Sequence, residues 1–250
     1  MERREVLLKT LGGASMALLP WSTWPVRAGA GLESRRNFAD LMEEVWDACY
    51  TGWSRLDYGY PIPYLDRAWA QLPQEAGNSV RAVIVEKRDE LVKFVRDAEN
   101  SLPSHRASVE RNPSCWEPRY WLAFTLKRAG RYQEAWDEYL AVAQITGCPD
   151  CLNDIGWCFY RKGMYEDARG YFERAKFEYD IPVAPFSGRM LALENRMLVY
   201  GQLGLRKQAV EAGKEYVSRY GRIGYPERRA LARIGIDADA IYLGQHAIEA

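Results

Sequence analysis

Two stretches in the middle of the chain repeat one another at a spacing of 33 residues. The first is Arg119-Tyr-Trp-Leu-Ala-Phe-Thr-Leu-Lys-Arg-Ala-Gly-Arg-Tyr-Gln-Glu-Ala135. The second is Leu152-Asn-Asp-Ile-Gly-Trp-Cys-Phe-Tyr-Arg-Lys-Gly-Met-Tyr-Glu-Asp-Ala168. Each contains the pattern Gly-x-Tyr-x-x-Ala, and an aromatic residue, Tyr139 or Phe172, follows four positions after the final Ala. A fixed period of this length predicts an array of similar structural units.

The shared positions have a physical reason if each unit is a pair of helices. Gly130 and Gly163 would end the first helix of each pair in a left-handed conformation, which other residues resist. Small residues would lie where the two helices cross, since only a small side chain lets the backbones approach closely. These residues are Ala123, Ala135, Gly156 and Ala168.

This pattern resembles the tetratricopeptide repeat (TPR), a helix-turn-helix unit of about 34 residues. The resemblance implies an all-α solenoid in which residues 116–176 form four consecutive antiparallel helices. A third, weaker copy lies at Met197-Leu-Val-Tyr-Gly-Gln-Leu-Gly-Leu-Arg-Lys-Gln-Ala209, with the extra spacing around 180–188. A degenerate earlier repeat would span 79–112, broken by Pro103.

The rest of the chain supports an all-α organisation. Apolar residues recur at helical spacing in 31–75 and 79–100, the tail after Pro226 suggests one or two capping helices, and strand-type alternation is absent. We therefore predict an export signal over 1–30, N-terminal helices over 31–103, TPR-like repeats over 104–222 and C-terminal capping helices over 223–250.

In stacked repeats of this kind, the first helix of each pair lines the inner face of a superhelix. The side chains that the alignment places there, and that we predict to bind a partner, are Tyr120, Phe124, Lys127, Arg128, Asn153, Trp157, Tyr160 and Arg161. The clamp by which some such domains grip a peptide C-terminus needs Lys and Asn where this chain has Tyr120 and Phe124. The aromatic set instead suits an apolar or proline-rich segment. Alternatively, residues 31–75 cover part of this face.

The first thirty residues differ in character from the rest. Arg3-Arg4, one further residue and then Val6-Leu7 resemble a twin-arginine (Tat) export signal, followed by a short apolar stretch and Ala28-Gly-Ala30. This predicts a periplasmic or secreted bacterial protein whose mature chain has no transmembrane segment. The alternative is an uncleaved helix or a cytosolic segment.

The cysteines leave three interpretations open. Cys148-Pro-Asp-Cys151 is the only Cys-x-x-Cys among five cysteines, and it lies between the two repeats. It could be a structural disulfide after export, a pair of reduced packing thiols, or a redox or metal site. Zinc would need more ligands at suitable spacing, and the two histidines are distant from it, so we predict no metal and no cofactor.

Composition and the lack of catalytic motifs limit the classes of function that the sequence supports. The chain has 250 residues, 48 % of them hydrophobic, and 34 basic side chains balance 34 acidic ones, which disfavours a nucleic-acid partner. The sequence shows no nucleophile motif, phosphate loop or dinucleotide fingerprint. We therefore predict a non-enzymatic adaptor that binds a protein or peptide. The alternatives are a cytosolic repeat sensor linked to transcription and an exported thiol-dependent enzyme that uses Cys148 and Cys151.

Overall fold

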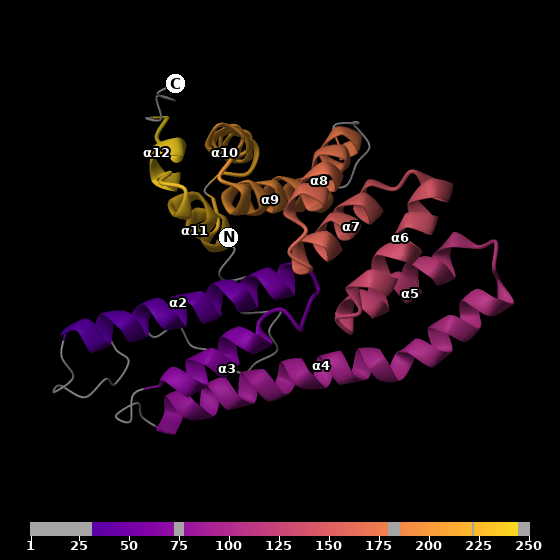
Figure 1. Cartoon of the computed structure of the whole chain (residues 1–250), viewed down its shortest axis with the longest axis horizontal. Coiled ribbons are helices and arrows are strands. Elements are labelled where there is room, and N and C mark those ends of the chain that lie inside the picture. The colour runs from indigo at the N-terminus through magenta and orange to yellow at the C-terminus, as the bar shows by residue number, and fades with distance from the viewer. Residues whose placement is uncertain (1–31, 73–77, 180–185, 222, 245–250) are drawn as a thin grey trace. The chain divides into compact units, whose positions relative to one another are not determined.

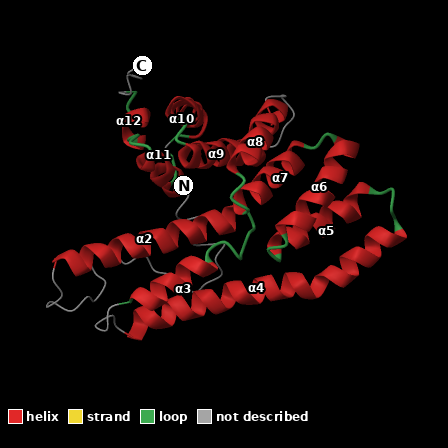
Figure 2. Cartoon of the chain, in the orientation of Figure 1, coloured by secondary structure: helices red, strands yellow, loops and turns green. Residues whose placement is uncertain are grey.

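The computed structural model describes residues 32–72, 78–179, 186–221 and 223–244, and these ranges contain helices and loops but no strand (Figure 2). The predicted all-α fold is therefore confirmed for this part of the chain. The helices are α2 (Leu32–Ser54), α3 (Ile62–Gln71), α4 (Asn78–Arg111), α5 (Trp116–Arg128), α6 (Tyr132–Thr146), α7 (Pro149–Arg161), α8 (Tyr165–Tyr179), α9 (Phe186–Leu203), α10 (Arg206–Tyr220), α11 (Tyr225–Arg233) and α12 (Ala238–Tyr242) (Figure 1). The predicted export signal lies outside the described residues.

The chain divides into two compact units. Among the described residues, the first comprises those before residue 47 and those of 63–89, and the second comprises those of 47–62 and those after residue 89. Within the first unit, Arg67 of α3 pairs with Glu44 of α2, and Arg88 of α4 pairs with Asp66 of α3. Its buried side chains include Leu41, Met42, Val45, Leu65, Ala68, Leu72, Val80 and Ile84.

Helices α5 to α10 pack in sequence, each against the next (Figure 1). The helix boundaries agree with the four helices that the repeat pattern predicts over 116–176. Gly130, Gly163 and Gly204 follow the first helix of each pair at φ of 76°, 75° and 70°. A Cβ added to any of these three glycines would have no atom within 4 Å. Glycine is therefore favoured at these positions by the left-handed backbone conformation and not by a close contact.

The predicted crossing residues are buried. Ala123, Ala135 and Ala168 are fully shielded from solvent. A Cβ added to Gly156 would lie 2.7 Å from the ring of Phe172, so the absence of a side chain on α7 lets this ring of α8 approach.

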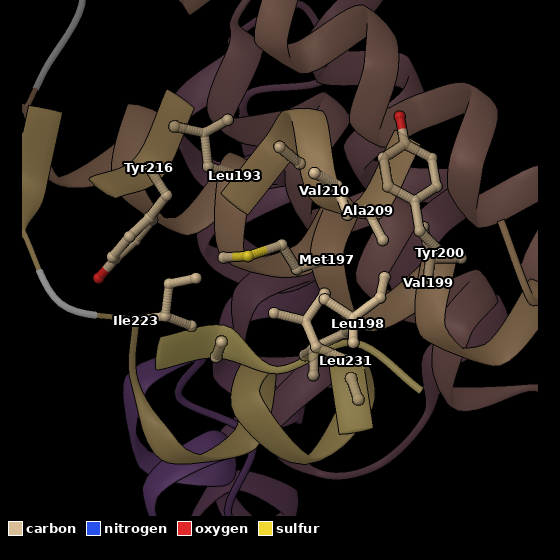
Figure 3. Packing of buried hydrophobic residues seen from close by; sticks show 14 of the residues in the cluster. Leu193, Met197, Leu198, Val199, Tyr200, Ala209, Val210, Tyr216, Ile223 and Leu231 are labelled. Atoms are coloured by element: carbon tan, nitrogen blue, oxygen red, sulfur yellow. The ribbon is translucent and has the colours of Figure 1, made fainter. Parts of the chain in front are cut away.

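The third helix pair, α9 and α10, shares one hydrophobic core with the C-terminal helices α11 and α12. Figure 3 shows Met197 of α9 among side chains of α10 and α11, including Tyr216 and Leu231. Met197 occupies the position that Ala123 and Gly156 hold in the earlier pairs, which accounts for the weaker sequence match. Helix α11 packs against α9, where a Cβ on Gly201 would meet the Ala230 carbonyl oxygen at 2.7 Å. The tail therefore forms two helices, as the sequence predicts.

Helix α4 corrects the expectation of a broken repeat over 79–112. It continues as one helix through Pro103, which cannot donate a hydrogen bond to the preceding turn. Buried Ala98 and Leu102 precede the proline, and Leu102 packs with the core of α5 and α6. Tertiary packing thus holds the helix together despite the missing hydrogen bond.

None of the described helices is both long and apolar enough to cross a lipid bilayer.

Candidate partner-binding face

The end of α2 directs a non-helical loop, residues 55–61, onto the first helices of the repeats. Asp57 N–H donates to the Gly52 carbonyl at 2.8 Å, and Leu56 N–H donates to the Trp53 carbonyl at 3.1 Å. These two bonds form a Schellman motif, in which one residue must be left-handed. Leu56 takes that conformation at φ 53°, the one non-glycine residue to do so among those described. Leu56 is thus a strained residue in the turn, and Arg55 and Asp57 are its neighbours in the sequence.

Asp57 is the centre of the contacts that this loop makes. Its side chain is fully buried and accepts hydrogen bonds from Trp157 Nε1 at 3.0 Å and from the Tyr132 hydroxyl at 2.9 Å. Arg161 Nε lies 2.8 Å from its Oδ2. A buried carboxylate is tolerated when it is paired with a cation and hydrogen-bonded, and Asp57 has both kinds of partner. Helices α6 and α7 thus form a site for one carboxylate, which the chain's own Asp57 fills.

The groups around Asp57 are electrostatically coupled. Burial raises the pKa of the Tyr132 hydroxyl well above its ordinary range, and the nearby Asp57 carboxylate raises it further. Burial opposes the charge of Arg161, but Asp57 and Tyr132 keep the pKa of its guanidinium above the ordinary value. At neutral pH Tyr132 is therefore a neutral donor and Arg161 a cation, the two states that suit a bound carboxylate.

Aromatic rings surround the same site. Tyr60 of the loop lies 5.6 Å from Trp157 between ring centroids, and Arg161 lies over the Tyr60 ring at 4.7 Å. Trp157 also stacks against Tyr160, with the two ring centroids 5.2 Å apart. With an exposed fraction of 1 %, Trp157 has no free surface for a partner while the loop is in place.

Arg55 binds the next first helix along the array. Its Nε donates to the Asn195 side chain at 2.6 Å, and Asn195 in turn donates to Asn153 at 3.0 Å. Glu227 and Glu194 carboxylate oxygens lie 3.5 and 4.0 Å from Arg55 Nη2. The guanidinium also lies over the Trp157 ring at 5.0 Å. Loop 55–61 is thus held to α7, α9 and α11 by a buried polar network as well as by Asp57.

The structure brings the predicted partner-binding residues together but exposes them to different extents. Asn153, Trp157 and Lys127 are buried, and Lys127 Nζ pairs with Asp154 Oδ1 at 2.7 Å. Five of them are only partly buried: Tyr120, Phe124, Arg128, Tyr160 and Arg161. These five are the members that solvent reaches, and Arg161 is already paired with Asp57.

The exposed part of this face is lined by α5. Arg128 lies over the rings of Tyr58 and Phe124, at 5.0 and 5.6 Å. Tyr120 packs edge-on against Tyr139 at 5.8 Å, and burial raises the pKa of the Tyr120 hydroxyl. Aromatic rings beside a guanidinium form a surface that suits an apolar or aromatic side chain with a nearby acid.

Sequence reasoning missed the residues that occupy the site. Residues 31–75 were the expected cover of this face, but Arg55 and Asp57, which precede the aromatic run Tyr58-Gly-Tyr-Pro-Ile-Pro-Tyr64, had no expected role. The available signal was two opposite charges flanking one residue at the start of that run. Their partners are distant along the chain, so no local pattern reveals the pairing.

The five cysteines all lie in the described ranges, and no disulfide bond joins any two of them in this structure. Cys151 and Cys158 are buried in the core around Leu126 and Tyr139, and burial raises the pKa of the Cys158 thiol. Cys148 and Cys151 are near neighbours at the start of α7. A disulfide between them remains a prediction.

In the described ranges, no group of three or more His, Cys, Asp or Glu side chains could hold a metal ion. The sequence matches no protein-family model and no curated protein.

Proposed function

We propose that the protein is a non-enzymatic scaffold of the tetratricopeptide-repeat kind that holds a protein or peptide partner. The main support is that the first helices of the array already bind a non-helical segment, loop 55–61, through charge-assisted hydrogen bonds and aromatic contacts. Charge-assisted hydrogen bonds and buried aromatic contacts also contribute strongly to binding at protein interfaces. Fold alone would be a weaker argument, since one fold hosts many functions.

The partner would contact the part of this face that loop 55–61 leaves accessible. Phe124 and Arg128 on α5, and Tyr160 on α7, are partly exposed and offer aromatic rings beside a cation. Trp157 and Asn153 would act beneath them as supports. A partner segment with an apolar side chain and an acidic neighbour fits this set of groups best.

A binding experiment with matched variants tests the proposal. The full chain is used to capture partners from an extract of the source organism, and the partner found by mass spectrometry is then purified and titrated. Arg128→Ala should weaken binding at least tenfold, or about 1.4 kcal/mol. The control is Arg174→Ala, because Arg174 also lies over a tyrosine, at 5.8 Å from Tyr171, but on the second helix of its pair. Equal affinities of the two variants would contradict the assignment of this face.

We place this scaffold outside the cytoplasm on the strength of Arg3-Arg4 and the Ala28-Gly-Ala30 end of the predicted signal. Fractionation of cells that express a C-terminally tagged chain tests this. A shortened product in the periplasm or medium is expected, and a full-length cytosolic product would favour the alternative of a cytosolic sensor.

A further inference from the structure

The turn between α6 and α7 presents two thiols on one helix start. Gly147 ends α6 at φ 65°, Cys148 is the N-cap residue of α7, and Pro149 occupies its first turn. The Cys148 N–H donates to the Thr146 hydroxyl at 3.1 Å. The chain direction is therefore fixed on both sides of Cys148, and Cys151 follows one helical turn later on the same side of α7.

The two thiols differ in exposure and are in contact. Cys148 is partly exposed, whereas Cys151 is fully buried in the core of the α5–α7 region. Cys148 packs against the core cluster that contains Cys151. An accessible sulfur can attack a disulfide, and a second thiol beside it can then resolve the mixed disulfide.

We propose that Cys148 and Cys151 form a reversible dithiol–disulfide site, in which Cys148 attacks a small-molecule disulfide and Cys151 resolves the intermediate. This site is independent of the proposed scaffold function, because neither thiol takes part in the contacts of loop 55–61.

The electrostatics assign the two roles. The Cys151 side chain lowers the pKa of Cys148 to about 6, and the backbone N–H groups of Cys151 and Asp150 lower it too, whereas burial and the Asp150 carboxylate raise it. The neighbouring Cys148, burial and the carboxylates of Asp154 and Asp150 raise the pKa of Cys151 far above its ordinary value. On α5, burial raises the pKa of the Tyr120 hydroxyl, which stays neutral, and Lys127 pairs with Asp154. At neutral pH the accessible sulfur is therefore the thiolate, which is the attacking species.

The exchange balances in two steps. The Cys148 thiolate attacks one sulfur of R–S–S–R, which forms a Cys148–S–S–R bond and releases one RS⁻. Cys151 then gives its proton to the first RS⁻ released and attacks the Cys148 sulfur, which forms the Cys148–Cys151 bond, breaks the Cys148–S–S–R bond and releases the second RS⁻. The thiolate–thiol pair loses two electrons and one proton, and the small disulfide becomes one thiol and one thiolate.

The preceding repeat provides an internal control. Cys115 is the N-cap residue of α5, as Cys148 is of α7, and it is more exposed. Its sulfur hydrogen-bonds the Glu117 carboxylate at 2.8 Å, which raises the pKa of the thiol. Exposure and helix position alone would make Cys115 the more reactive thiol, whereas the proposal requires Cys148 to be so.

The test uses the full chain in mixtures of oxidised and reduced glutathione, followed by acid quenching and peptide mass spectrometry. The expected product is a Cys148–Cys151 disulfide that reduced glutathione reverses. Cys151→Ser should stop at a glutathione adduct on Cys148, and Cys148→Ser should give no adduct on Cys151. If both thiols of the unmodified chain stay reduced in excess oxidised glutathione, the proposal is wrong.

Alkylation kinetics give a second readout that needs no variant. In the reduced chain at pH 7, iodoacetamide should modify Cys148 at least tenfold faster than Cys115, with a half-maximal rate near pH 6. A faster reaction at Cys115 would overturn the assignment of the attacking thiol. Cys151→Ala should move the Cys148 half-maximum to higher pH, because it removes the side chain that lowers the pKa of Cys148.

Discussion

The pairs α5/α6 and α7/α8 share one register but differ in what covers their first helices. Phe124 and Trp157 occupy equivalent positions, yet Phe124 is partly exposed and Trp157 is 1 % exposed. Asp57 and Tyr60 of loop 55–61 make the difference, since both contact Trp157. The repeat register therefore sets the direction of a side chain, but a distant segment decides whether solvent or a partner can reach it.

The strongest test of this comparison truncates the two equivalent aromatic residues. Trp157→Ala should lower the free energy of unfolding by about 3–5 kcal/mol, because it leaves a cavity and removes one of the hydrogen bonds to the buried Asp57 carboxylate. Phe124→Ala should lower it by about 1–2 kcal/mol, because its ring is already partly in water. Urea unfolding of the two variants measures both values. Equal losses would mean that loop 55–61 does not cover Trp157 in solution.

Removing the negative charge of Asp57, which lies against α7, should have the next largest effect on the free energy of unfolding. Asp57→Asn keeps the shape of the side chain but leaves Arg161 without its anion, and we expect a loss of about 2–3 kcal/mol. Glu134→Gln is the control, since the Arg131–Glu134 pair is 34 % and 44 % exposed and should contribute under about 1 kcal/mol. An unchanged melting temperature for Asp57→Asn would argue against the buried pair.

The register that the two helix pairs share can be tested by substitutions where the helices cross. Ala135→Leu and Ala168→Leu should each cost about 1–3 kcal/mol, because both side chains are fully buried and a larger one overpacks the crossing. Gln133→Leu, at an exposed position of α6, should change stability by less than about 0.5 kcal/mol. A tolerated leucine at only one crossing would show that the pairs do not share their register.

We expect the smallest change in stability from a substitution in the turn that begins loop 55–61, at Leu56. Leu56→Gly should raise stability by up to about 1 kcal/mol, since glycine adopts the left-handed conformation without strain and the Leu56 side chain is 38 % exposed. Leu243→Gly should instead lower stability slightly, because Leu243 has φ −81°. Denaturant midpoints of both variants distinguish the two outcomes, and a loss at Leu56 would mean that its side chain packs in solution.

Much of the repeat architecture was predictable. The four helices predicted over 116–176, the glycines that end the first helices and the small residues at the crossings all follow from the period and the residue types. Pro103 shows the limit of the same reasoning, because a proline that disfavours a helix locally lies inside α4, where buried Leu102 supports it.

The candidate site was predictable only in part. The register placed Trp157 and Tyr160 on one side of α7, and they do stack on each other. It could not show that Asp57 would fill the site formed by Tyr132, Trp157 and Arg161. Nor could it show that Cys148 and Cys151 would differ so much in burial.

The sequence by itself thus determined the all-α fold, the helix pairs and the directions of their side chains, because these depend on periodicity and on the conformational limits of single residues. Only the tertiary structure decided which first-helix residues remain open. The bond between Trp157 and Asp57 joins residues 100 positions apart. Such a contact depends on where the whole chain places two helices, and no local pattern encodes it.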